Sequence, residues 1–280
     1  MNIIRCIVWI TISVISLSLS AQNKAFEVKV SGKGEPLLFF PGFTCPGEVW
    51  DDLVLELAKT NECHVFTFAG FGNVSPIEKP WLPKIKEEIS QYITKKTLQK
   101  ATIVGHSLGG ALGLWLASES TFDFNKIIVV DALASTGALM MPDFNSEAIV
   151  YDNPFNQTLL DMDAKSFELM ADQMVLGMAL NKEKHELLKS WILNTDRETY
   201  VYGYTDLLKL DLRKVLAQIK VPVTILAATQ PYGKENVKKT YKDQYKNLDK
   251  YSIKFADESA HFIMFDQPEW LLANIIEELK

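Results

Sequence analysis

A serine framed by two glycines carries the strongest chemical signal in the chain: Ser107 stands between Gly105 and Gly109. A β-branched apolar run at 102–104 precedes this motif, and a helical apolar pattern at 111–117 follows it. The sequence therefore predicts a strand, a sharp turn and a helix, with the serine hydroxyl exposed at the apex. We expect side chains at 105 and 109 to collide with the adjoining strand and helix, so the strained turn requires glycine there. Such a hydroxyl can attack as a nucleophile once a neighbouring base takes its proton.

The elements that must position this serine alternate between strands and helices. Apolar runs predict strands at 26–30, 36–40, 64–68, 101–104, 126–130, 222–227 and 252–255. Besides the helix after Ser107, helical spacing predicts helices at 50–57, 81–94 and 268–279. This alternation predicts an α/β fold, with a mostly parallel sheet covered by helices on both faces.

A long interval separates the predicted strands at 126–130 and 222–227. It shows helical periodicity but no strand of comparable strength, and it is too long for a loop inside a compact domain. An insertion at the carboxyl edge of an α/β sheet lies where ligands bind. We therefore expect a core of residues 22–134 and 217–280 and a helical cap of residues 135–216.

The composition limits the classes of partner. A chain of 280 residues with 48% hydrophobic and 23% charged residues can bury a large core and has no signature of disorder. Its formal net charge of −6, without any cluster of lysine and arginine, argues against binding to nucleic acid or to an anionic membrane. We expect a small-molecule substrate, and the composition leaves the oligomeric state open.

The N-terminus reads as a targeting segment. Arg5 precedes an apolar stretch at 7–19, and small residues end it just before Gln22. These features predict a secretory signal peptide at residues 1–21. The stretch falls short of the roughly 20 apolar residues that a membrane span requires. We therefore expect an exported protein, periplasmic or extracellular, that has no integral membrane span after cleavage.

Two cysteines, Cys45 and Cys63, remain in the predicted mature chain. An oxidising compartment permits a disulfide between them, but two separate buried thiols fit the sequence equally well. Neither cysteine has a companion at a metal-ligand spacing, so we expect no metal site, and no cofactor motif is present.

Three more segments occur in an order that matches a known family. They are residues 39–43 after a predicted strand, residues 68–72 after the next, and residues 259–262 before the last helix. Together with the serine motif, these segments resemble the His-Gly-x segment, the glycine-rich turn and the late histidine of the α/β-hydrolases. The resemblance covers essentially all of the mature sequence. It departs from the family pattern at Pro41, where histidine is usual.

The resemblance implies a role for each site residue. Ser107 would be the nucleophile and His261 the base that takes its proton, as in other serine hydrolases. The backbone N–H groups of Phe43 and Leu108 would form the oxyanion hole. Of the four histidines, the other three stand at a strand start, inside the serine motif and among charged residues of the predicted cap.

The acid of the triad departs from the common pattern. The resemblance places it just after the strand at 222–227, but Pro231 stands where aspartate is expected, and no carboxylate follows before Glu235. Some family members, haloalkane dehalogenases among them, carry the acid one strand earlier, and Asp131 ends that strand here. We expect Asp131 to be the acid, in the order Ser, Asp, His. Glu235, with Asp257 behind it, is the alternative.

The resemblance implies metal-free hydrolysis through an acyl-enzyme, with a carboxylic ester of small to medium apolar groups as the expected substrate. A serine aminopeptidase-like enzyme is an alternative, and it would need acidic cap residues to bind the substrate amine. A C–C hydrolase or an acyltransferase would use the same triad. A receptor-like binding protein has the least support, because Ser107 and His261 are both present.

Overall fold

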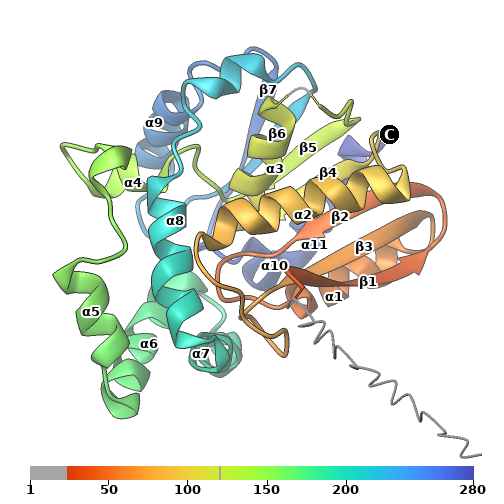
Figure 1. Ribbon diagram of the computed structural model, residues 1–280. Coiled ribbons are helices and arrows are strands. Elements are labelled where there is room, and N and C mark those ends of the chain that lie inside the picture. The colour runs from red at the N-terminus through yellow and green to blue at the C-terminus, as the bar shows by residue number, and fades with distance from the viewer. Residues whose placement is uncertain (1–23, 120) are drawn as a thin grey trace, which may run out of the picture.

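The computed structural model describes residues 24–119 and 121–280, so the signal peptide predicted at residues 1–21 lies outside the described part. One seven-stranded sheet forms the centre of the fold (Figure 1). Its strands are β1 (Phe26–Gly32), β2 (Glu35–Phe40), β3 (Asn61–Phe68), β4 (Thr102–His106), β5 (Lys126–Val130), β6 (Val223–Ala228) and β7 (Tyr251–Ala256). The spatial order is β1-β3-β2-β4-β5-β6-β7, and only β1 runs antiparallel to its neighbour. The prediction of a mostly parallel sheet is confirmed.

Helices connect these strands. They are α1 (Asp51–Leu57), α2 (Trp81–Lys96), α3 (Leu108–Ser118), α4 (Thr136–Met140), α5 (Pro154–Asp161), α6 (Ala164–Met178), α7 (His185–Asn194), α8 (Tyr204–Lys209), α9 (Lys234–Gln244), α10 (Ile263–Asp266) and α11 (Pro268–Glu278). Between β5 and β6 the chain forms α4 to α8 and contributes no strand to the sheet. Figure 1 shows most of these helices grouped beside the sheet rather than layered on it. The domain boundaries at 135 and 216 stay a prediction.

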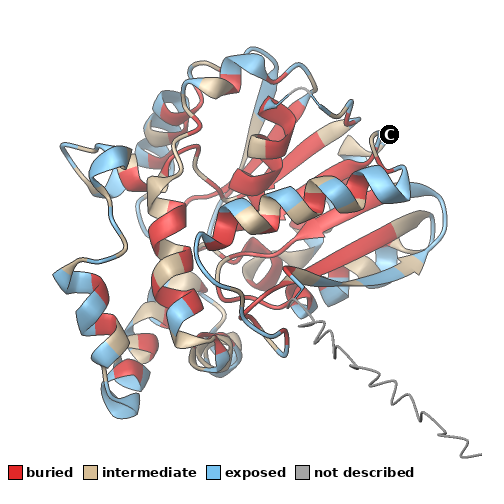
Figure 2. Cartoon of the chain, in the orientation of Figure 1, coloured by how far each residue is buried: buried red, intermediate tan, exposed pale blue. Residues whose placement is uncertain are grey.

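The sheet has an apolar layer on each face. Successive residues of a strand point to opposite faces, so Leu37 and Phe39 pack into one layer and Leu38 and Phe40 into the other. Helices α2, α3 and α9 add side chains to the layer of Leu38, and α1 and α11 to the layer of Leu37. Figure 2 shows buried residues along the strands and α3. The predicted coverage of both faces is confirmed.

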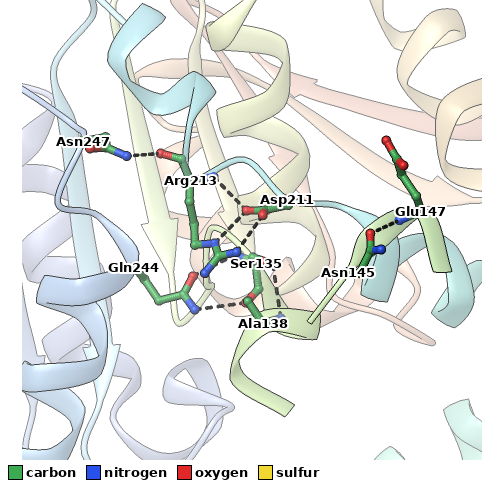
Figure 3. A network of polar contacts seen from close by, with 8 residues as sticks. All are labelled: Ser135, Ala138, Asn145, Glu147, Asp211, Arg213, Gln244 and Asn247. Carbon is green, nitrogen blue, oxygen red and sulfur yellow. Dashed lines mark hydrogen bonds and ion pairs between the residues drawn. The ribbon is translucent and has the colours of Figure 1, made fainter. Parts of the chain in front are cut away.

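A polar network fastens both ends of the segment between β5 and β6 (Figure 3). The Gln244 amide accepts a hydrogen bond from the backbone N–H of Ser135 at 2.9 Å and donates to its carbonyl at 3.1 Å. Near the other end, Asn247 donates to the backbone carbonyl of Arg213 at 2.7 Å. The guanidinium of Arg213 in turn makes two bonds to Asp211. Both junctions thus depend on the end of α9 and the loop after it.

Two further features answer questions that the sequence leaves open. Cys45 and Cys63 are free and buried, so they form two separate thiols in this structure rather than a disulfide. Burial raises the pKa of the Cys63 thiol to about 11, which keeps it protonated. Across the described ranges, no helix combines the length and apolarity that crossing a membrane would demand.

Candidate active site

Ser107 occupies a strained turn between β4 and α3. Its backbone has φ 52° and ψ −118°, a conformation that side-chain-bearing residues rarely adopt. A Cβ on Gly105 would lie 2.3 Å from the carbonyl oxygen of Gly109, and one on Gly109 would lie 2.2 Å from that of Phe40. The turn therefore requires both glycines, because helix α3 and strand β2 fill the space on either side. The collisions expected from the sequence, of side chains at 105 and 109 with the adjoining helix and strand, are therefore confirmed.

His261 lies between β7 and α10 and lines the same cavity as Ser107. Its Nδ1 is 2.6 Å from Oδ2 of Asp131. An ionised carboxylate only accepts hydrogen bonds, so Nδ1 carries the proton in this contact. The lone pair of Nε2 then remains available to take a proton, which is what a general base requires.

Asp131 follows directly after β5, with φ 45°. Strands β5 and β6 are neighbours, and the Asp131 N–H donates to the carbonyl of Leu226 on β6 at 2.8 Å. Its Oδ1 accepts hydrogen bonds from the Ala228 N–H at 2.9 Å and from the Tyr241 hydroxyl at 2.8 Å. Two donors thus hold Oδ1 of the carboxylate, and its Oδ2 faces His261.

The two other candidate acids lie elsewhere. Glu235 is exposed in the first turn of α9, and Asp257 is exposed and forms an ion pair with Lys234 at 2.9 Å. Neither lines the cavity that Ser107 and His261 share. Of the three carboxylates that the sequence puts forward, the structure brings Asp131 alone to His261.

His106 packs under the candidate base. It is fully buried, its Nε2 donates to the backbone carbonyl of His261 at 3.0 Å, and the two ring centroids are 4.6 Å apart. Burial, and then the neighbouring His261, lower the pKa of His106 well below its ordinary value, so this ring stays neutral. A Cβ on Gly42 would lie 2.6 Å from its Nδ1, so only glycine lets the loop after β2 pack here. This contact was not among the sequence predictions.

The two candidate oxyanion donors belong to Leu108, which follows Ser107 in the chain, and to Phe43, in the loop after β2. Leu108 is the first residue of α3, where N–H groups have no partner within the helix and the helix dipole favours negative charge. Phe43 lies in the loop after β2 and lines the cavity together with Ser107. Its ring packs against Tyr200 and Tyr204, which come from the segment between β5 and β6. This arrangement can stabilise an oxygen that becomes negative beside Ser107.

The cavity in front of these residues has a volume of about 800 Å³ and an apolar lining from the segment between β5 and β6. Leu139, Met140, Met174 and Met178 contribute to this part of the wall. Uncharged polar side chains also line the cavity, among them Gln230 and Asn236, and so does Pro231. Among the described residues that line the cavity there is no lysine, arginine or glutamate.

Comparison with known proteins places the chain in a family. The model of the alpha/beta hydrolase family matches residues 37–274. An AB hydrolase superfamily protein of Bacillus subtilis is 27% identical over 73% of this chain and 77% of its own length. A pimeloyl-[acyl-carrier protein] methyl ester esterase of Vibrio cholerae is 26% identical over 91% and 98%. The enol-lactonase structure from Burkholderia xenovorans has a TM-score of 0.76 at 14% identity, covering 91% of this chain and 96% of that one. The chain belongs to the alpha/beta hydrolase family.

Proposed function

We propose that this protein is a serine esterase that cleaves carboxylic esters of small to medium apolar groups through an acyl-enzyme. The observation that carries the proposal is the shared cavity, which Ser107 and His261 both line while Asp131 binds His261. The similarity to proteins named as a methyl ester esterase and as an enol-lactonase supports ester chemistry.

In the first half-reaction, the Ser107 hydroxyl attacks the ester carbonyl carbon while Nε2 of His261 takes its proton. The carbonyl oxygen becomes negative and accepts hydrogen bonds from the N–H groups of Phe43 and Leu108. Removal of one such donor in a serine hydrolase costs about 3 kcal/mol of barrier. The imidazolium then protonates the leaving alcohol, and the acyl group stays on Ser107.

In the second half-reaction, water takes the place of the alcohol. Nε2 of His261 accepts a proton from the water, whose oxygen attacks the acyl carbon. The same proton returns to the oxygen of Ser107, which leaves as a hydroxyl, and a carboxylic acid is released. Throughout both steps Asp131 stays ionised, keeps the proton of His261 on Nδ1 and stabilises the imidazolium.

The alternatives share this machinery but differ in what must be bound. An aminopeptidase needs a carboxylate near the scissile bond to hold the substrate amine. The acidic cap residues that the sequence offers are exposed or partly exposed, and none lines the cavity; they are Asp161, Asp163, Glu168 and Asp172. A C–C hydrolase or an acyltransferase would differ in the substrate or in the acyl acceptor, so both remain second to the esterase.

Export is a separate part of the proposal. It rests on the charge, the apolar stretch and the small residues of positions 1–21. The expected result is that the mature protein, isolated from its native cell envelope or medium, begins at residue 21 or 22. N-terminal sequencing checks this, and a retained residue 1 would contradict it.

The test of the esterase compares Ser107→Ala with wild type on p-nitrophenyl butyrate. Loss of the nucleophile is expected to lower kcat by on the order of 10⁴-fold or more. Ser118→Ala is the matched control, since Ser118 is a buried serine at the other end of α3 whose hydroxyl donates to the backbone carbonyl of Trp115. This control is expected to keep kcat within about twofold, because its hydroxyl is far along the helix from the turn.

Thermal unfolding of both variants establishes that they are folded. Undiminished turnover by folded Ser107→Ala would remove the proposal. The butyryl anilide and an aminoacyl anilide, assayed in parallel, separate the bond types. Faster cleavage of the aminoacyl anilide than of the ester would assign the site to the peptidase alternative.

A further inference from the structure

The carboxylate of Asp131 has a hydrogen-bond donor that the proposed reaction does not use. Its Oδ2 faces His261, and its Oδ1 is shared by the Ala228 N–H and the Tyr241 hydroxyl. Rotation about the last side-chain bond of an aspartate is soft, so one bond to Oδ1 leaves the plane of the carboxylate weakly defined. Two donors that approach Oδ1 from β6 and from α9 define that plane.

Helix α9 carries Tyr241 to this point. The helix is polar on its outer side, and it buries Val237 and Tyr241 on the side that faces the sheet. Tyr241 is 5% exposed, and burial, followed by the charge of Asp131, raises its pKa well above the ordinary value. The hydroxyl therefore keeps its proton and remains a donor at neutral pH.

We propose that Tyr241 is a positioning residue of the active site, whose hydroxyl fixes the carboxylate plane of Asp131 so that Oδ2 stays on Nδ1 of His261. This role rests on the proposed function of the His261–Asp131 pair. Tyr241 acts through Asp131 and takes no part in bond making. The backbone of β6 gives Oδ1 of Asp131 one hydrogen bond, from the N–H of Ala228. Tyr241 adds the second hydrogen bond to that oxygen, from α9.

The chain offers a matched control four residues further along. Tyr245 is fully buried, stacks on Tyr241 with ring planes 2° apart, and its hydroxyl donates a hydrogen bond to the backbone carbonyl of Ala132 at 2.7 Å. Tyr241→Phe and Tyr245→Phe each keep the ring and remove one buried hydrogen bond. Both variants should fold and lose similar stability, yet only Tyr241→Phe loses a donor to Asp131.

The kinetic test uses the ester assay. Tyr241→Phe is expected to lower kcat about tenfold while KM stays within about twofold, since misplacement of a catalytic group affects the chemical step more than binding. Tyr245→Phe is expected to keep both constants within about twofold of wild type. Equal effects of the two variants on kcat would overturn the proposal.

A double variant isolates the route of the effect. If Tyr241 acts through Asp131, adding Tyr241→Phe to Asp131→Asn should change kcat by less than about twofold, because the positioned carboxylate is already gone. A further tenfold loss in the double variant would show that Tyr241 acts by another route.

A measurement without turnover keeps this inference separate from the proposed function. The His261 Nδ1 proton, held between nitrogen and a carboxylate oxygen 2.6 Å apart, should give a strongly downfield proton resonance. This resonance should move in Tyr241→Phe and stay in place in Tyr245→Phe. An identical resonance in both variants would refute the positioning role, whereas a wild type that cleaves no ester would refute only the esterase.

Discussion

Two neighbouring strands end close enough to His261 for either to supply a carboxylate. Strands β5 and β6 pair in parallel, so their carboxyl ends lie about 4.8 Å apart, less than the reach of an aspartate side chain and its hydrogen bond. Pro231 stands in the loop after β6, where the sequence pattern expects the acid, and Asp131 ends β5. The same imidazole can therefore be held from one strand earlier without moving Ser107 or His261.

Replacement of Asp131 by asparagine tests this residue directly. An asparagine that turns its NH₂ toward Nδ1 makes that nitrogen an acceptor, so the proton moves to Nε2 and no base faces Ser107. We expect Asp131→Asn to lower kcat by on the order of 10³–10⁴-fold. Glu235→Gln, at an exposed position, should stay within about twofold of wild type. Steady-state kinetics on one ester checks both, and the reverse ranking would move the acid to Glu235.

At the scale of elements, the carboxylate of Asp206 links α8 to the start of α2 through a hydrogen bond. Asp206 is buried on α8. Its carboxylate accepts one hydrogen bond from the backbone N–H of Leu82 at 3.0 Å and another from the hydroxyl of Tyr151. Leu82 is in the first turn of α2, where N–H groups lack partners within the helix. Asp206 therefore caps a helix of the sheet layer from within the segment between β5 and β6.

This cap predicts a pH dependence of stability. Burial raises the pKa of Asp206 above its ordinary value, so the folded protein holds this proton at pH values where the unfolded chain has lost it. In that window the folded state binds more protons, and the free energy of unfolding falls as pH rises. Asp206→Asn cannot titrate, so the stability of wild type relative to this variant should decrease as pH rises above about 4, the ordinary pKa of an aspartate. Urea unfolding of both proteins measures this difference, and an increase with pH would contradict it.

The inner strands were predictable from sequence because they are short runs of mostly β-branched and apolar residues, as in residues 126–130. Helix α9 was not, since lysine and other polar residues dominate it. Its buried residues are Val237, Tyr241 and Gln244, of which only the first two are apolar or aromatic. The hydrogen bond from Tyr241 to Asp131 joins residues 110 positions apart. Local pattern carries no information on such a contact, nor on the order of strands in the sheet.

At the scale of the whole molecule, charge favours a neutral substrate. The chain carries a formal net charge of −6, which repels anions at long range. Within the described part of the chain, the cavity wall has no lysine or arginine to pair with a buried anion. A carboxylate that enters an apolar site without a partner loses its hydration and gains no compensating contact.

A matched pair of substrates tests this property. Dimethyl suberate and monomethyl suberate differ in one end group, which is neutral in the first and a carboxylate in the second. We expect kcat/KM for the dimethyl ester to be at least about tenfold higher per ester group, equivalent to about 1.4 kcal/mol. Chromatography of the products measures both rates. Equal rates would mean that the anionic end stays outside the cavity or is paired there.

The order of the site residues along the chain has a practical consequence. Phe43, Ser107, Leu108 and Asp131 all precede the segment of α4 to α8, and His261 follows it. With the roles proposed above, a chain divided within that segment would leave one fragment with every group except the base and the other with the base alone. Neither half alone would then hydrolyse an ester, and we expect activity only where the two halves reassociate into the complete fold. The fold therefore suits a split-enzyme reporter, in which ester cleavage signals that two fused partners have met.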